Sequence, residues 1–499
     1  MSQSAQPQAA QSPPAGTDGE PGTKPFSWRF TTPLFIGSAL NPINSSLIAT
    51  ALVPIAAGVH VSIGQTAALV TALYLASAIA QPTAGKVAEV FGPRRVFLAG
   101  IFLVLAGGLL GGFARDLLTL LASRALIGLG TSCAYPTAML LIRRRAQQSG
   151  MDKPPGGVLG GLQIAGIATA SLGLPAGGVL VDALGWRAVF FVNVPVALIA
   201  LSATLLWIPK DAPPEGSRRV REIASRIDAA GIAGFAVAMT ALLMFLFSLP
   251  RPDWIMLGVT VAAWAALVAW ELRARSPFFD VRLLASNLAL TRTYLRFALV
   301  LLCVYIVLYG ITQWLEAGRG FSAISTGLLL LPMTAISGVI IAPISRRNLV
   351  RGPVIAAAIA CLAGSAGVLF LGSSTSIVWI IAITLAFGIA MGAGASGNQT
   401  ALYTQAPADQ LGTASGLLRT FGYVGSIASS AITGIVFHTG VSDHGLHTIG
   451  WIMVGVSAVL VLVTLADRTL RGPGQTDDSA AGHASESRPR AHPARDATG

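Results

Sequence analysis

Long apolar stretches, separated by short polar segments, follow one another along nearly the whole chain. A helix needs roughly 20 apolar residues to cross about 30 Å of hydrocarbon, and a window of that length finds fourteen candidate spans. They lie near residues 31–57, 64–84, 95–114, 118–141, 158–181, 186–208, 229–249, 253–271, 294–315, 323–344, 353–372, 377–402, 411–436 and 449–466. The pattern predicts an all-α integral membrane protein with fourteen transmembrane helices.

The amino-acid composition indicates that these helices are surrounded by lipid and not by water. Of the 499 residues, 53% are hydrophobic and 11% are charged, and a chain this apolar cannot hide its surface in a water-soluble core. We therefore expect the lipid bilayer as a partner. A net charge of +12 would suggest nucleic acid for a soluble protein, but here the basic residues lie between apolar stretches, where they orient helices. We expect no nucleic-acid partner and, because Cys133, Cys303 and Cys361 lie in apolar stretches like small packing residues, no metal site.

Polar composition also sets the expected domain boundaries. Residues 1–30 and 467–499 are poor in apolar residues and are expected to be disordered tails. Between them we expect an N-terminal six-helix bundle at 31–208 and a C-terminal six-helix bundle at 294–466. Residues 209–293 would hold basic inner loops and two extra spans that are central in the sequence.

The distribution of basic residues predicts the orientation. If the N-terminus is inside, inner loops and tails hold 26 of the 33 Lys and Arg residues, outer loops hold four and the spans hold three. Because basic loops stay on the cytoplasmic side, we expect a multi-pass protein of the cell membrane with both termini in the cytoplasm.

An internal repeat supports the two bundles. The basic segment GKVAEVFGPRRV, residues 85–96, follows the second span, and SRRNLVRGPVIA, residues 345–356, follows the tenth. Each contains a Gly-Pro pair, and the two pairs are 260 residues apart. Duplicated bundles that rock about a central site are a recurrent design of secondary transporters.

Several motifs carry a family resemblance. GKVAEVFGPRR has Gly85, Gly92, Arg94 and Arg95 in the places of a known inner-loop motif, RALIGLG at 124–130 is similar to a fourth-span motif, and GLPAGG at 173–178 is similar to a fifth-span motif associated with antiporters. With GWRAVFFVNVP and GRGFSAISTGLLLLP, these matches cover most of residues 30–440. The chain resembles the major facilitator superfamily, and within it the fourteen-span drug:proton antiporters.

The resemblance implies a major facilitator fold and a function. A member of this family would be a secondary active transporter that exports a drug-like or secondary-metabolite small molecule by alternating access. The proton gradient would supply the energy, no cofactor would be needed, and a monomer would suffice. Inward transport or proton-independent transport of a specific metabolite is the alternative. A polytopic membrane enzyme would need clustered nucleophiles, paired carboxylates or metal ligands, and the sequence shows none, so we expect a transporter and not an enzyme.

The sequence departs from the family pattern at several positions. Asn44 stands where the first span usually has an aspartate, and an amide exchanges no proton in the physiological range. Glu89 replaces an aspartate of the inner-loop motif, Ile127 replaces a glutamine of the fourth span, and the proline of the fifth span is displaced to Pro175.

Candidate coupling residues follow from where the charges fall. All 21 Asp and Glu residues lie in tails, loops or span ends, so the ionisable groups within spans are Arg124, Arg296 and Arg419. Charges in a bilayer are costly and mark function by default. A role in coupling or substrate binding is one interpretation of Arg124 and Arg419, and pinning of helices through carbonyl groups is the other; Arg296 is expected to extend toward the membrane surface. The candidates for coupling are Arg124, Asp182, Asp228, Glu316 and Arg419.

Two groups of motif residues predict a gate and a moving helix. Glu89 with Arg94 and Arg95 can form an ion-pair lock between span ends near Gly85 and Gly92, although the arginines could also reflect charge orientation alone. We expect the helix that carries the small residues and proline of the fifth-span motif to face the other half of the molecule. These are Gly173, Pro175, Gly177 and Gly178.

Polar and aromatic side chains at mid-depth are candidates for a substrate pocket, since buried amides and phenols need partners. Each could instead bond a neighbouring helix. Because arginine is the buried charge, an anionic or zwitterionic substrate fits at least as well as a lipophilic cation. The candidate substrate-binding residues are Asn41, Asn44, Ser45, Gln163, Tyr305, Tyr309, Gln313, Asn398, Gln399, Tyr403 and Tyr423.

Overall fold

The computed structural model describes residues 25–61, 63–151, 153–211, 227–249, 251–275, 277–278, 280–321, 323–437 and 440–467. In these ranges the chain forms helices and no strand. Most of the two predicted tails, and the basic segment 212–226, lie outside the described residues.

The first half of the chain folds into an N-terminal bundle, followed by a helical hairpin. The bundle consists of α1 (Trp28–Gly58), α2 (Ile63–Phe91), α3 (Pro93–Gly112), α4 (Leu117–Ser132), α5 (Ala134–Gln148), α6 (Gly156–Leu184), α7 (Ala188–Phe191) and α8 (Asn193–Trp207). The hairpin consists of α10 (Ala229–Ser248) and α11 (Trp254–Glu271).

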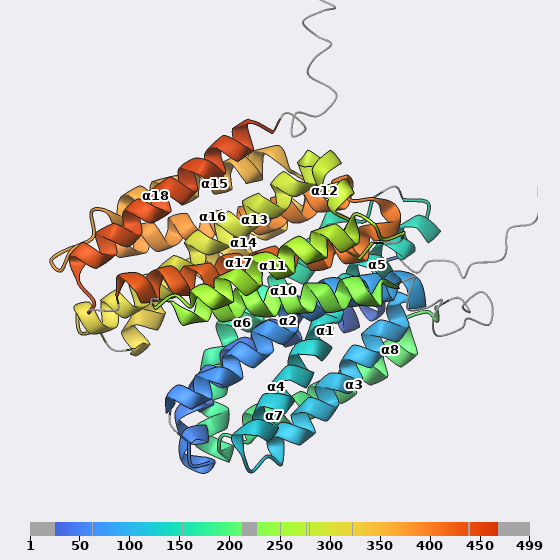
Figure 1. Ribbon diagram of the computed structural model, residues 1–499, viewed down its shortest axis with the longest axis horizontal. Coiled ribbons are helices and arrows are strands. Elements are labelled where there is room, and N and C mark those ends of the chain that lie inside the picture. The colour runs from blue at the N-terminus through green and yellow to red at the C-terminus, as the bar shows by residue number, and fades with distance from the viewer. Residues whose placement is uncertain are drawn as a thin grey trace, which may run out of the picture.

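The second half forms a C-terminal bundle. It consists of α12 (Val281–Ser286), α13 (Leu288–Ile306), the π-helical turns η1 (Val307–Ile311) and η2 (Trp314–Gly318), α14 (Ala323–Arg346), α15 (Arg351–Val368), α16 (Ile377–Gln405), the 3₁₀ turn η3 (Ala408–Gln410), α17 (Leu411–Val436) and α18 (Asp443–Leu465). Figure 1 shows the two bundles packed against each other, with the N-terminal one from blue to green and the C-terminal one from yellow to red.

Each of the fourteen predicted spans contains helix, but the apolar criterion separates them. In the described part of the chain, twelve helical segments are long and apolar enough to cross a membrane. The helices α1 and α17 are not among these twelve. They carry polar side chains within their length, such as Asn41 and Asn44 on α1 and Arg419 on α17, which lower the hydropathy of any window that contains them.

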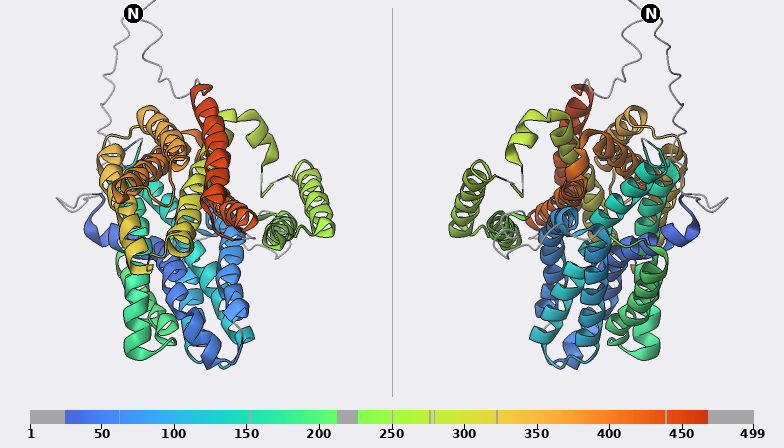
Figure 2. Two further views of the ribbon diagram at one scale, coloured as in Figure 1. Left: turned by 90° about the vertical axis from the view of Figure 1, so that its left-hand side faces the viewer. Right: turned by 90° about the vertical axis from the view of Figure 1, so that its right-hand side faces the viewer.

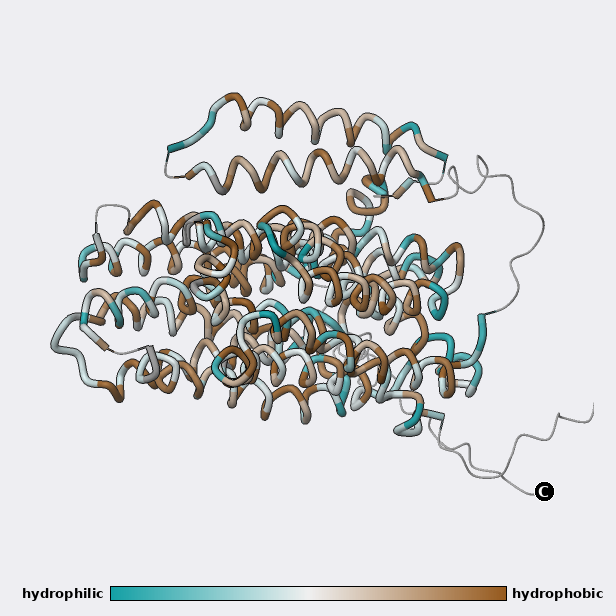
Figure 3. Tube along the Cα trace, turned by 90° about the horizontal axis from the view of Figure 1, so that it is seen from below, coloured by the Kyte–Doolittle hydropathy of each residue, from teal (hydrophilic) through white to brown (hydrophobic). Residues whose placement is uncertain are grey.

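The hairpin lies at the side of the molecule, although it is central in the sequence. The helix α10 contacts α2 and α17, and Figures 2 and 3 show α10 and α11 together beyond the rest of the bundle. Large apolar side chains on α11 are strongly exposed, for example Trp254 and Ile255. An exposed apolar helix of this length is suited to contact with lipid.

The buried core differs between the two ends of the molecule. One hydrophobic cluster contains residues of both bundles, such as Phe97 and Leu140 with Leu402 and Leu411. A second cluster belongs to the C-terminal bundle alone, and a third to the N-terminal bundle alone. The halves thus share one core at the end where α2 finishes and α17 begins, and they have separate cores toward the opposite end.

Candidate gate and central binding site

We call the end with the shared core the basic end, because it carries Arg94, Arg95, Arg143, Arg144, Arg145, Arg346 and Arg347. The helix α2 ends there and α17 begins there, and the two lie against each other. This contact joins the N-terminal and C-terminal bundles, so any relative motion of the bundles must break or bend it.

Glycines bring the backbones of α2 and α17 together at the basic end. A Cβ atom added to Gly85 would lie 2.2 Å from the carbonyl oxygen of Gly412, and one added to Gly416 would lie 2.4 Å from the carbonyl oxygen of Gln81. Small residues permit such close helix packing in membranes. We call this contact the α2–α17 gate; it consists of Gln81, Gly85 and Glu89 on α2 with Gly412, Thr413 and Gly416 on α17.

A carboxylate on α2 accepts hydrogen bonds from α17 across the gate. Glu89 accepts hydrogen bonds from the backbone N–H of Thr413, with an N···O distance of 2.7 Å, and from its hydroxyl at 3.1 Å. Thr413 is in the first turn of α17, where backbone N–H groups have no partner within the helix. The positive end of the helix dipole also favours a negative charge there. Glu89 therefore caps a helix of the opposite bundle.

The predicted ion pair of Glu89 with Arg94 and Arg95 is absent from the described contacts. The carboxylate of Glu89 bonds Thr413 instead, because Gly92 turns the chain away from α2 with φ of +101°. Arg94 donates to the carbonyl of Leu205 at 3.2 Å, so the arginines lie on the α8 side of the turn.

Asp211 is the acid at this turn, and no motif in the sequence indicated it. It accepts from the backbone N–H of Arg95 at 2.9 Å and forms a salt bridge of 3.1 Å with Arg144. The residue follows the sixth predicted span, and no local pattern links it to residues 67 and 116 positions earlier. It would also meet any side chain at Gly92, whose Cβ would lie 2.4 Å from its carboxyl carbon.

Polar side chains of both bundles meet next to the gate. The hydroxyl of Tyr423 on α17 donates to Asn41 on α1 at 2.9 Å, and Gln81 donates to that hydroxyl at 3.0 Å. Asn41 also donates to Ser77 and Thr131 at 3.0 and 2.9 Å. These bonds link α1, α2, α4 and α17.

A cation lies in the same region. The guanidinium of Arg419 stacks over the ring of Tyr135 at 4.1 Å and donates to Gln163 at 3.4 Å. The ring of Tyr74 lies 5.9 Å from that of Tyr423. We call this group the central belt; its members are Asn41, Tyr74, Gln81, Tyr135, Gln163, Arg419 and Tyr423.

The other predicted pocket residues are not members of the central belt. Asn44 is buried and donates to Asn193 and to the carbonyl of Leu40, so it joins helices of one bundle, and Ser45 donates to the carbonyl of Asn41. The rings of Tyr305 and Tyr309 lie 5.6 Å apart and are partly exposed.

Four more candidates lie away from the central belt. Gln399 donates to the sulfur of Met139, and the ring of Tyr403 faces Arg143 near the basic end. Asn398 accepts from Arg296. Gln313 is exposed between the two π-helical turns at the opposite end. The predicted pocket residues therefore do not form one cluster.

Arg124 makes the contacts of a helix-pinning residue. It is 1% exposed and donates to the carbonyl of Leu69 at 3.2 Å and twice to that of Asn44 at 3.3 Å. It thereby ties α4 to α2 and α1. The pinning interpretation accounts for these contacts without a coupling role.

The acids proposed to act with Arg124 have other surroundings. Asp182 and Glu316 are exposed. Asp228 caps α10, where its carboxylate accepts from Gly231, Phe278 and the indole of Trp270 at 3.0 to 3.1 Å. None of the hydrogen bonds of Asp228 reaches Arg124.

Arg296 is paired rather than extended toward the membrane surface. It is fully buried and forms a salt bridge of 2.6 Å with Asp467, and it donates to Thr293 and Asn398. The expectation of an extended side chain is wrong, because a carboxylate lies within reach inside the bundle. Asp467, the first residue of the predicted C-terminal tail, is buried and packs with the C-terminal bundle.

The fifth-span motif faces its own bundle. A Cβ on Gly173 would lie 2.4 Å from that of Ser46, and one on Gly177 would lie 2.5 Å from the hydroxyl of Thr50, both on α1. Pro175 is exposed, and Gly178 has open space around its Cα. These four residues therefore do not face the other half, although their helix does, as expected, because α6 packs against α14. The helix α6 reaches α14 through its first turns instead, where a Cβ on Gly160 would lie 2.6 Å from Ser345.

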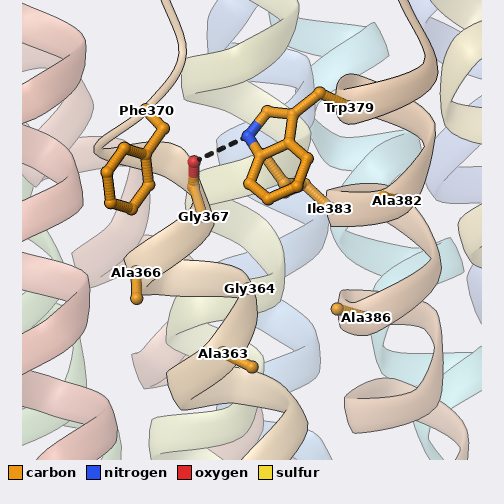
Figure 4. A pocket seen from close by; sticks show the side chains of 9 residues that line it. All are labelled: Ala363, Gly364, Ala366, Gly367, Phe370, Trp379, Ala382, Ile383 and Ala386. Carbon is orange, nitrogen blue, oxygen red and sulfur yellow. Dashed lines mark hydrogen bonds between the residues drawn. The ribbon is translucent and has the colours of Figure 1, made fainter.

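A shallow groove of about 320 Å³ lies elsewhere, between α15 and α16. Figure 4 shows its lining of Ala363, Gly364, Ala366, Gly367, Phe370, Trp379, Ala382, Ile383 and Ala386. The indole of Trp379 donates to the carbonyl of Gly367 at 3.2 Å. The groove holds none of the candidate residues and no charged side chain, so we assign it no role in recognising a substrate.

Comparison with known families decides the class. The family model "Major Facilitator Superfamily" matches residues 34–430. The protein belongs to the major facilitator superfamily. It is therefore a multi-pass membrane transporter of small molecules and not an enzyme.

Relatives within the superfamily include proteins named for resistance. The chain is 31% identical over 88% of its length to the uncharacterized MFS-type transporter YwoD of Bacillus subtilis, of which it covers 96%. It is 28% identical over 87% of its length to the tetracenomycin C resistance and export protein of Streptomyces glaucescens, of which it covers 79%. The multidrug resistance protein Stp of Mycobacterium tuberculosis is 27% identical over 74% of this chain and is covered over 68% of its own length.

Solved structures show the same fold. The human organic anion transporter MFSD10 aligns with a TM-score of 0.59 and 17% identity, over 87% of this chain and 99% of its own. The proton:xylose symporter XylE aligns with a TM-score of 0.57 and 13% identity, over 87% of this chain and 94% of its own. At these identities the likeness concerns the major facilitator fold alone.

Proposed function

We propose that the protein is a proton-coupled exporter of drug-like or secondary-metabolite molecules, active as a monomer, that works by alternating access. The observation that carries the proposal is the asymmetric joining of the two bundles. They share a core and the α2–α17 gate at the basic end, while each has its own core at the opposite end. Resistance and export proteins among the relatives support an outward direction.

The proposed orientation places the basic end in the cytoplasm. Arginines of both bundles gather there, and such residues are retained on the cytoplasmic side. The structure then corresponds to a state that is closed toward the cytoplasm, and both termini are cytoplasmic.

We include α1 and α17 among fourteen spans. Both helices line the contact between the bundles, and their polar side chains bond across it, as Tyr423 does with Asn41. A helix whose polar residues meet protein rather than lipid can cross a membrane despite a lower hydropathy.

Proton coupling has a physical basis in the gate. Protonation of Glu89 would remove the charge that the first turn of α17 stabilises and would weaken its bonds to Thr413. The bundles could then separate at the basic end, where Glu89 would meet the cytoplasm and lose its proton. In this scheme Glu89 takes the role that the sequence alone assigned to Asp182, Asp228 or Glu316.

The test is transport by the purified full chain in lipid vesicles. Anionic, neutral and cationic aromatic dyes would be offered with and without an imposed pH gradient, and with a proton uncoupler. We expect at least one dye to accumulate in response to the gradient and to be released by the uncoupler. Transport that ignores the gradient would contradict proton coupling, and failure to move any dye would contradict the proposed substrate class.

A further inference from the structure

Arg419 is a charge in a spanning helix without an acidic partner. It is in the middle of α17 and is partly exposed between the two bundles. In the described part of the chain no carboxylate lies within salt-bridge distance of its guanidinium; its contacts are the ring of Tyr135 and a long hydrogen bond to Gln163. A charge in the membrane interior costs several kcal/mol unless something compensates it.

The positive charges of the other two arginines within the predicted spans are compensated by nearby acceptor groups. Arg296 has Asp467 at 2.6 Å, together with two further bonds. Arg124 has three hydrogen bonds to backbone carbonyls. Both are almost completely buried, whereas Arg419 remains accessible. Arg419 therefore differs from both in exposure and in lacking strong acceptors.

A second observation at the same place points to a ligand. The hydroxyl of Tyr135 belongs to a residue that is only 5% exposed, and it faces the guanidinium of Arg419, which can only donate; in the described part of the chain the hydroxyl proton has no acceptor. A buried hydroxyl normally has a partner. A donor without an acceptor thus lies beside a cation without an anion, and one acidic group could satisfy both.

The surroundings favour an aromatic molecule. Tyr74 and Tyr423 face each other in the central belt, and Tyr305 lies close enough to both Arg419 and Tyr423 for electrostatic interaction. Aromatic side chains provide flat apolar surface with a polar tip. Guanidinium groups bind carboxylate, sulfonate and phosphate through two parallel hydrogen bonds.

We propose that Arg419 binds an anionic group of the transported molecule, with the Tyr135 hydroxyl as a second donor, and that the substrates are aromatic organic anions. The inference rests on the proposed transport function and specifies its substrate class. Arg419 belongs to the C-terminal bundle, whereas Tyr135 and Gln163 belong to the N-terminal bundle. A bound anion therefore replaces the weak contact of Arg419 with Gln163 by strong bonds to both bundles. Because the α2–α17 gate is nearby, binding of the anion is expected to affect whether the gate opens.

Three probes with one ring system test the charge preference: naphthoate, naphthamide and naphthylmethylammonium. Their binding to the purified full chain would be measured by calorimetry, and their movement would be measured in vesicles. We expect naphthoate to bind roughly tenfold or more tightly than the other two, since charged hydrogen bonds exceed neutral ones by about this much. R419Q should abolish this preference, and R419E should transfer it to the ammonium probe.

Matched variants distinguish the loss of a ligand contact from the loss of folded protein. Y135F removes the hydroxyl alone and should weaken naphthoate several-fold while leaving naphthamide unchanged. R346Q removes an exposed arginine at the basic end and should leave the preference intact. R419K keeps the charge without the paired donors and should retain only part of the preference.

The outcomes separate this inference from the proposed function. Naphthoate binding that is unchanged in R419Q, a wild-type preference for the ammonium probe, or binding of none of the three overturns the anion site. If the protein transports the neutral and ammonium probes but not naphthoate, the proposed transport function stands and the anion site is overturned. Arg419-dependent binding of naphthoate without movement of any probe supports the site and counts against transport of this class.

Discussion

At the scale of single residues, we expect the two hydrogen bonds between Glu89 and Thr413 to hold the gate closed. E89A should raise the open population roughly 10- to 150-fold, because charge-assisted bonds of this kind contribute about 1.5–3 kcal/mol. The reporter is S345C, a buried position between the bundles at the basic end, in a chain whose three native cysteines are alanine. Its rate of reaction with a soluble maleimide measures the opening.

A double-mutant cycle assigns that effect to the contact. T413V removes the hydroxyl that donates to Glu89, and its effect should be smaller in the E89A background than in the wild type. T240V is the control, because the hydroxyl of Thr240 bonds its own helix on the hairpin. Equal reporter rates in wild type and E89A would refute the role of Glu89.

Arg124 offers a second prediction at this scale. R124K cannot reach three carbonyl contacts on two helices and should reduce stability by about 2–3 kcal/mol, seen as a lower unfolding temperature of the purified protein. Transport per folded molecule should remain close to that of wild type. R346K, at an exposed position, is the control. A variant that unfolds like wild type and yet loses transport would instead establish Arg124 in coupling.

Individual residues also show where sequence reasoning stops. The three arginines within spans were found from the sequence, but their partners were not, because Asp467, Asn44 and Tyr135 are distant in the chain or contribute backbone atoms. The place of Glu89 in a gate was expected, whereas its partner Thr413 lies 324 residues away. A single sequence carries no signal for such a pair.

At the scale of helices, glycine contacts decide how closely α2 and α17 approach. G85A places a methyl group 2.2 Å from the carbonyl oxygen of Gly412, so the helices must separate. Overpacking of this kind costs about 1–3 kcal/mol, which corresponds to a roughly 5- to 150-fold shift toward the open state. The S345C reporter should react faster by a factor in this range, and transport should fall.

The control for G85A is G338A, a glycine within α14 that has nothing within 4 Å of an added Cβ. Because alanine favours helix more than glycine does, G338A should be neutral or slightly stabilising. If both variants leave the reporter rate and transport unchanged, the close contact is not the gate.

Helix positions were predictable, but helix neighbours were not. Hydropathy located helix in all fourteen predicted spans because the period and length of apolar runs are local properties. The motif glycines Gly173 and Gly177 could equally have packed on either bundle, and they pack on α1. The side position of the α10–α11 hairpin is likewise a property of tertiary packing.

At the scale of the whole molecule, the internal repeat and the apolar spans sufficed to predict two bundles, and the family match agrees with them. The conformational state was not predictable, because one sequence must support every state of a transport cycle. The shared core at the basic end, and the separate cores beyond it, are what identify the closed side.

Distances between spin labels across the two ends test alternating access most directly. One pair would be placed at Gln147 and Arg347 across the basic end and the other at Ala57 and Ala317 across the opposite end, all at exposed positions. We expect the wild type to show a short distance across the basic end, and E89A to lengthen this distance while shortening the one across the opposite end. If both distances change in the same direction, or if neither changes, the account of an alternating-access transporter gated by α2 and α17 is contradicted.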